Sequence, residues 1–295
     1  MTDRWSLPVA GWLFACLTLA YLPDIGHGFI ADDFAWVAHG HVAGVSDLTG
    51  RLLMSVGGFF RPVLLLSFAA NRMLSGVSPF GFALGNLLLA CAVAAAIVAL
   101  VRARGFSVME GLFAAGVWAF NLHGPGMALL WISGRASLLA TLGAVLAARA
   151  TVQGRTFAIA LWTAFALGST EEALPLALLL SAWRTAAHQR DGRSWGIAIA
   201  SGLRDARSAW AVTALYAAAR MTTDAMTITT APPEYRHAVY AAAPDRCEPR
   251  CEPCWLSATS CARHRRRLAI ERLSRARRDG PEARRSHCRV WRSTA

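Results

Sequence analysis

The stretch that decides the fold is residues 81–101, GFALGNLLLACAVAAAIVALV, which contains no charged residue. As a helix it would extend about 31 Å at 1.5 Å per residue, which matches the roughly 30 Å hydrocarbon core of a bilayer. A single segment satisfies its backbone hydrogen bonds in lipid only as a helix. The stretch therefore predicts a transmembrane helix, and the fold depends on how many similar segments the chain holds.

Further apolar runs lie near 5–22, 106–121, 128–148, 156–168, 172–183 and 208–221. Arginines occupy every second connection between the runs: Arg4, the pairs Arg102/Arg104 and Arg149/Arg155, and a cluster from Arg184 to Arg207. Basic connections face the cytoplasm under the positive-inside rule. The sequence therefore predicts an all-α, polytopic integral membrane bundle of about seven transmembrane helices in the inner (cytoplasmic) membrane. The composition agrees, because 55% of the residues are hydrophobic and 16% are charged.

This topology places the loop 23–80 outside the membrane. Within it, residues 47–60 and 62–76 are apolar but interrupted by Arg51, Asn71 and Arg72. Both are too short to span a bilayer, so they predict helices lying in the outer interface. Pro62 suits the first turn of such a helix.

The C-terminal residues 231–295 differ from the transmembrane domain predicted for 1–230. Residues 244–295 hold 14 of the 30 arginines and five of the seven cysteines. We interpret this tail as disordered or out of frame, in a truncated or frameshifted chain. Two alternatives remain: a metal site on Cys247, Cys251 and Cys254, or an arginine-rich segment on an anionic membrane surface.

Two adjacent acids, Asp32 and Asp33, stand in the apolar stretch FIADDFAWV of the outer loop. A carboxylate beside a partly desolvated surface can act as a general base toward an attacking hydroxyl. A solvated turn or a helix cap explains the same pair. The acids alone do not decide between these interpretations.

Three sequence blocks that occur in a fixed order favour the general-base interpretation. They are RPVLLLSFAANRMLSGVSPFGFALGNLLL at 61–89, WISGRASLL at 131–139 and STEEALPL at 169–176. Together with the acidic pair, they resemble the type-C (GT-C) membrane glycosyltransferases, in particular the protein O-mannosyltransferase-like proteins that carry tetratricopeptide repeats. The resemblance covers about residues 5–185. At 122–131 the chain reads LHGPGMALLW, which retains only His123 of a longer His and Glu pattern.

The resemblance implies a function: transfer of a sugar from a polyprenyl-phosphate donor to a protein or glycolipid acceptor on the outer face of the membrane. It implies a catalytic role for Asp32 and Asp33. From the residue chemistry, Arg135 and Arg61 are candidates to bind the donor phosphate. His123, Glu171 and Glu172 are candidate polar residues of the cavity. We expect no metal, no other cofactor and no nucleic-acid partner.

Local interpretations of these residues remain open. Ser169 with Glu172 three residues later predicts a capping box, and Arg135 could reach the headgroups by snorkelling. A non-catalytic multi-pass protein, either transporter-like or a scaffold, is the alternative to the enzyme.

Overall fold

The computed structural model describes residues 6–30, 32–52, 59–121 and 125–222. These residues form helices and short 3₁₀ turns, with no strand in the described ranges. All of them belong to one compact unit, Met1–Ala242. The all-α prediction is therefore confirmed for this part of the chain. The predicted boundary at 231 and the cysteine-rich tail lie outside the described residues and stay predictions.

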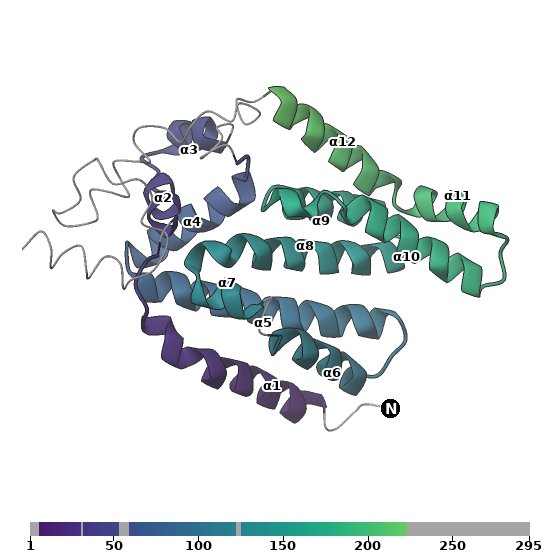
Figure 1. Ribbon diagram of the computed structural model, residues 1–295, viewed down its shortest axis with the longest axis horizontal. Helices are drawn as coiled ribbons and strands as arrows, with labels where there is room; N and C mark the ends of the chain where they lie inside the picture. The colour runs from purple at the N-terminus through teal and green to yellow at the C-terminus, as the bar shows by residue number, and fades with distance from the viewer. Residues whose placement is uncertain (1–5, 31, 53–58, 122–124, 223–295) are drawn as a thin grey trace, which may run out of the picture. The chain divides into compact units, whose positions relative to one another are not determined.

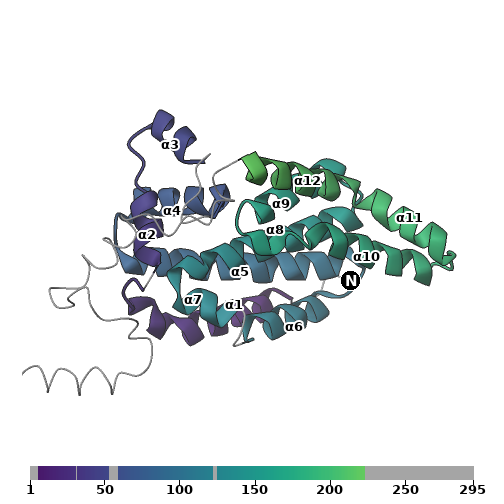
Figure 2. The same cartoon turned by 45° about the horizontal axis from the view of Figure 1, so that its top comes forward.

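Two long helices, α5 (Pro79–Ala103) and α8 (Arg135–Val152), lie side by side in the centre of this unit (Figures 1 and 2). The 3₁₀ turn η3 (Ile132–Gly134) leads directly into α8. The segments Pro79–Ala103 and Ile132–Val152 are the two helices of the described residues that are long and apolar enough to cross a bilayer. The helix predicted at 81–101 is thus present. Seven crossings stay a prediction.

Shorter helices flank this central pair. On the α5 side are α1 (Ser6–Tyr21) and α6 (Val108–Ala119). On the α8 side are α9 (Thr156–Leu167), α10 (Leu176–Arg190), α11 (Trp195–Asp205) and α12 (Arg207–Thr222). The sequence predicted α11 only as part of an arginine-rich connection, because its uncharged run is short and lies between Arg193 and Arg204. The structure instead packs it as a helix against α10.

The predicted run 128–148 is divided in the structure. A single turn, α7 (Met127–Leu130), and η3 precede α8, so the long regular helix begins only at Arg135. Trp131 between them has an extended backbone, with φ −121° and ψ 114°. This break brings Ser133 and Arg135 to the end of the central pair where the outer loop lies.

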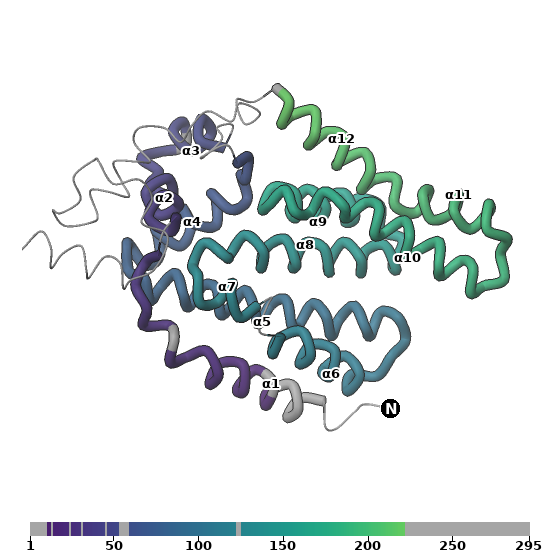
Figure 3. The backbone as a smooth tube through the Cα atoms, viewed as in Figure 1, coloured from purple at the N-terminus to yellow at the C-terminus, as the bar shows by residue number. Residues whose placement is uncertain are grey.

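The described residues of the loop 23–80 form α2 (Asp33–His39), α3 (Val45–Leu52) and α4 (Pro62–Ser75) at one end of α5 and α8 (Figure 1). The 3₁₀ turn η1 (Leu22–Gly26) connects α1 to this end. Pro62 is the first residue of α4, as predicted. The first part of the helix predicted at 47–60 is present as α3, and residues 53–58 lie outside the described residues. The backbone trace in Figure 3 shows α2, α3 and α4 gathered beside one another.

Large apolar side chains point outward from helices on both sides of the unit. Phe113 of α6 is 75% exposed, and Phe157 of α9 is 81% exposed. Trp12 of α1 and Leu215 of α12 are also mostly exposed. An apolar surface of this extent is atypical of a protein that water surrounds, and it fits contact with lipid chains.

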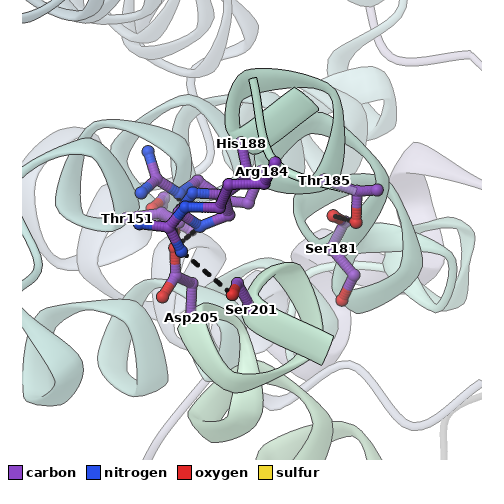
Figure 4. Close-up of polar contacts among 9 residues, drawn as sticks. Thr151, Ser181, Arg184, Thr185, His188, Ser201 and Asp205 are labelled. Carbon is purple, nitrogen blue, oxygen red and sulfur yellow. Dashed lines mark hydrogen bonds and ion pairs between the residues drawn. The ribbon is translucent and has the colours of Figure 1, made fainter. Parts of the chain in front are cut away.

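The opposite end of the helices is held by charged contacts, drawn in Figure 4. Asp205 at the end of α11 accepts hydrogen bonds from Arg184 Nε at 2.7 Å and from His188 Nε2 at 3.0 Å. Thr151, in the last turn of α8, lies beside this group. The connections α5–α6 and α10–α11, both rich in arginine, lie at the end away from α2 and α4 (Figure 1).

Candidate functional site

A buried arginine, Arg135, connects the helices α4, α5 and α8. Arg135 is only 2% exposed. Its Nε donates to Asn86 Oδ1 at 2.6 Å, and its Nη2 donates to Asn71 Oδ1 and to the Phe82 carbonyl, both at 2.7 Å. Its Nη1 donates to the Ser67 carbonyl at 3.2 Å. One guanidinium thus ties the start of α8 to α4 and α5.

The surroundings of Arg135 are shaped to hold this group. The guanidinium carbon lies 5.0 Å from the ring centre of Phe68 and 5.5 Å from that of Phe82, within cation–π range. A Cβ added at Gly85 would lie 2.7 Å from Arg135 Nη2, so glycine leaves the space that the guanidinium needs. Asn86 also donates to the carbonyls of Ala128 and Ile132. The arginine and its partners therefore position the segment that precedes α8.

Asp33 is directed into the protein. It is 0% exposed, and it accepts hydrogen bonds from the N–H of Ser133 at 2.7 Å and from the N–H of Ile30 at 2.9 Å. Burial raises the pKa of Asp33 above its ordinary value, and these two N–H groups oppose the rise without cancelling it. Asp33 also interacts electrostatically with Arg135. Asp33 therefore joins α2 to the start of α8.

Asp32 has a different environment, although it is the adjacent residue. It is only partly buried, and its Oδ1 accepts a hydrogen bond from Ser133 Oγ at 3.0 Å. Its Oδ2 has no hydrogen-bond partner among the described residues. Ser133 thus contacts both acids: its N–H donates to Asp33, and its hydroxyl donates to Asp32 and also interacts with the Asp33 carboxylate.

A pocket of about 270 Å³ opens beside Asp32. Its polar lining consists of Asp32, Arg61, Ser133, Ser137, Thr170 and Glu172. Aromatic side chains complete the wall: Trp36, Phe59 and Trp131. A concave site with apolar walls and a few convergent polar groups is typical of small-molecule binding.

Two arginines hold Glu171 at the edge of this pocket. Arg61 Nε lies 2.9 Å from Glu171 Oε2, and Arg220 Nη1 lies 2.6 Å from Glu171 Oε1. Tyr216, one turn before Arg220, donates from its hydroxyl to the Phe60 carbonyl at 3.1 Å. These contacts attach α12 to the residues that begin α4, and so they hold Arg61 in the pocket wall.

The charge of Glu171 is favoured at this place. Burial alone would raise its pKa, but the backbone N–H of Glu171 and the charges of Arg61 and Arg220 outweigh burial, so the pKa lies below its ordinary value. A lowered carboxyl pKa contributes stability above the unfolded-state value of about 4.3. That stability is lost as the pH falls through the folded-state pKa. The contacts are therefore complete at neutral pH.

Replacing Glu171 by Gln should destabilise the unit by about 1–3 kcal/mol, because two half-buried guanidinium groups lose their counter-ion. The measurement is the thermal unfolding midpoint of the purified protein in detergent at neutral pH. Asp191→Asn, which removes an exposed carboxylate, is the control and should leave the midpoint unchanged. An unchanged midpoint for Glu171→Gln would mean that this ion triad adds no net stability.

The structure separates the predicted site residues into groups. It brings Asp32, Arg61 and Glu172 together in the pocket, and places Glu171 behind Arg61. Arg135 lies outside the pocket lining, and its hydrogen bonds are committed to the protein, so this arrangement does not support its predicted phosphate contact. Snorkelling of Arg135 is wrong, because the side chain is buried inward. His123 lies outside the described residues.

The capping box predicted from Ser169 and Glu172 is also wrong. Ser169 Oγ donates to the Phe165 carbonyl of the preceding helix, and Thr170 is the residue whose side chain caps the next turn, η4 (Glu171–Ala173). The sequence pattern misled because the helix α9 continues its hydrogen bonding to Ser169. This one-residue shift leaves Glu172 free to line the pocket.

Several polar residues of the site were not singled out from the sequence, among them Ser133, Asn86 and Arg220. Asn86 did carry a signal, since a polar side chain inside an apolar run is costly and commonly functional. Ser133 and Arg220 carried none, because nothing local indicates which distant residues they contact.

Comparison with known proteins gives two relatives. The chain is 35% identical to Protein O-mannosyl-transferase Tmtc1 of Drosophila melanogaster over 125 residues, which are 38% of this chain and 14% of that protein. It is also 35% identical to Protein O-mannosyl-transferase Tmtc2 of the same species over 141 residues, 42% of this chain and 15% of that protein. The chain thus spans about one-seventh of the length of each. No family model matches, and no solved structure matches.

Proposed function

We propose that this chain is the membrane-embedded part of a glycosyltransferase that transfers a sugar from a polyprenyl phosphate to a hydroxyl acceptor. Mannose is the first sugar to test. The observation that carries the proposal is the pocket, in which a partly exposed carboxylate, Asp32, faces a guanidinium, Arg61, between aromatic walls. The similarity to two O-mannosyl-transferases supports the same chemistry. The seven-span, type-C architecture is part of this proposal.

Asp32 is the general base of the proposed reaction. The acceptor hydroxyl gives its proton to the carboxylate while its oxygen forms a bond to the anomeric carbon of the sugar. The bond between that carbon and the phosphate oxygen breaks, and polyprenyl phosphate leaves with the electron pair. Attack from the side opposite the phosphate inverts the configuration. Asp33 cannot serve in this way because it is fully buried and accepts two backbone hydrogen bonds.

Arg61 is the group that stabilises the leaving phosphate. Its guanidinium lines the pocket and stacks on Phe59, with 4.3 Å from the guanidinium carbon to the ring centre. Glu171 uses its Nε. A guanidinium presents five N–H donors in a planar fork, so the remaining N–H groups of Arg61 can reach phosphate oxygens. Phosphate stabilisation by a positioned cation is an electrostatic contribution that grows as charge develops on the leaving group.

The pocket would open on the outer, non-cytoplasmic side of the membrane. Arginine-rich connections lie at the opposite end of α5 and α8, which the positive-inside rule assigns to the cytoplasm. The exposed apolar faces of α1, α6, α9 and α12 suit a lipid environment, from which a polyprenyl donor would approach. A pocket of about 270 Å³ is close to the lower end of the roughly 300–1,000 Å³ range of ligand sites, and it suits one sugar unit.

The test is a transfer assay with the full chain in lipid nanodiscs. The probes are radiolabelled polyprenyl-phosphate mannose and a soluble peptide rich in serine and threonine. Transfer of label to the peptide, at a rate above that of empty nanodiscs, is the expected result. Absence of transfer from mannosyl and glucosyl polyprenyl phosphates alike would overturn the proposal.

A further inference from the structure

We infer that Ser133 is the positioning residue of the site: its hydroxyl orients Asp32 as the base, while its backbone N–H holds Asp33 as a buried support. This inference rests on the proposed function and adds to it a residue with a separate task. Ser133 belongs to neither acid's helix, since it lies in η3, 100 positions later in the sequence.

The geometry gives Ser133 two contacts of different kinds. Its N–H donates to Asp33 Oδ1 at 2.7 Å, and its Oγ donates to Asp32 Oδ1 at 3.0 Å. Adjacent residues in a helical turn direct their side chains about 100° apart. One residue that binds both carboxylates therefore fixes the rotation of the α2 start relative to α8. Asp33 faces inward as a result, and Asp32 faces the pocket.

The hydroxyl contact also determines which oxygen of Asp32 is available for chemistry. Oδ1 is engaged by Ser133, whereas Oδ2 has no partner in the described part of the chain. A carboxylate held through one oxygen keeps the other at a fixed place, from which it can take a proton from a hydroxyl in the pocket. Without that contact the carboxylate could rotate, and fewer of its orientations would be productive.

Ser133 is itself held in place by the network below it. It is 8% exposed, and the neighbouring Ile132 carbonyl accepts a hydrogen bond from Asn86 Nδ2 at 3.0 Å. Asn86 in turn accepts from Arg135. The chain of contacts therefore runs from a buried guanidinium, through Asn86 and η3, to the hydroxyl that meets Asp32. This arrangement is what a rigid, preorganised site requires.

The decisive variant is Ser133→Ala, because it removes the hydroxyl that binds Asp32 and retains the N–H that donates to Asp33 at 2.7 Å. The hydroxyl also interacts with Asp33, and the variant removes that smaller interaction as well. We expect kcat for transfer to fall roughly tenfold or more, with the KM for polyprenyl-phosphate mannose unchanged, since Arg61 and the aromatic walls remain. The other charged groups near Asp32, namely Asp33, Arg61 and Glu172, are the same in both proteins.

Thr141→Ala is the matched control. It removes a hydroxyl from α8 one turn beyond Ser137, which lines the pocket, and Thr141 Oγ1 donates to the Ser137 carbonyl. Its kcat and KM should equal those of the unchanged protein. A kcat of Ser133→Ala equal to that of Thr141→Ala would overturn the inference while leaving the proposed function intact.

A second readout does not depend on transfer. Carbodiimide labelling with mass spectrometry reports how readily the Asp32 carboxyl reacts. Labelling of Asp32 should be at least about threefold faster in Ser133→Ala than in Thr141→Ala, because the hydrogen bond that holds the carboxylate is absent. If the unchanged protein transfers no sugar, the proposed function fails, and this labelling rate still decides whether Ser133 orients Asp32. Equal labelling rates would count against that role.

Discussion

Asn in place of Asp32 is expected to lower kcat for sugar transfer by roughly 100- to 10,000-fold, the usual contribution of a general base. The amide keeps the size of the carboxyl and can still accept from Ser133 Oγ, but it cannot take the proton of the acceptor hydroxyl. The protein should therefore fold normally, with the same elution profile and thermal midpoint. The measurement is single-turnover transfer in nanodiscs with saturating polyprenyl-phosphate mannose.

Asp47→Asn is the control for this experiment. Asp47 is a carboxylate of the same outer region, it forms an ion pair with Arg51 on α3, and it lies outside the pocket. Its replacement should leave kcat unchanged. If Asp32→Asn retained full activity and Asp33→Asn lost it, the base would have to be reassigned to Asp33, and the pocket would have to open toward it.

The second large effect concerns stability. Replacing Arg135 by Leu removes the donor of three short hydrogen bonds, which Asn86 Oδ1, Asn71 Oδ1 and the Phe82 carbonyl accept. It also leaves Asp33 buried without its nearby positive charge. Breaking a buried charged group away from its partners costs about 3–5 kcal/mol. Since whole proteins are stable by only about 5–15 kcal/mol, the variant should yield little monodisperse protein.

Fluorescence-detected size exclusion in mild detergent measures this yield. Arg155→Leu is the matched control, because Arg155 is an exposed arginine between α8 and α9, and it should express like the unchanged protein. Arg135→Lys keeps a charge but cannot reproduce the planar fork, so it should fall between the two. A normal yield and midpoint for Arg135→Leu would show that the network is dispensable for folding.

The bundle itself was predictable because it depends on local properties. The apolar run at 81–101, the arginines in alternate connections and Pro62 at a first turn each follow from hydropathy, charge or backbone geometry. The helices α5 and α4 appear where these signals place them. The failures were also local in origin. Charges concealed the helix α11, and an apparent cap at Ser169 belonged to the end of α9.

The individual roles of the site residues were less accessible. The resemblance selected Asp32 and Asp33, and residue chemistry selected Arg61 and Arg135, but neither distinguished between the two members of its pair. The structure assigns two of them to the pocket and two to the interior. A single residue step along a helix rotates a side chain by about 100°, so adjacent identical acids can have opposite environments.

The sequence alone therefore determined that the chain is helical and apolar, and that an acidic pair lies in its first long loop. Only the tertiary structure decided that Asp32 faces a pocket while Asp33 is buried, and that Arg135 supports the site from below. The physical reason is the distance along the sequence over which each interaction acts. Helix formation and hydropathy are read over ten to twenty neighbouring residues, whereas Ser133 and Arg135 meet their partners across gaps of 49 to 101 positions. Only tertiary packing brings residues that far apart in the sequence into contact.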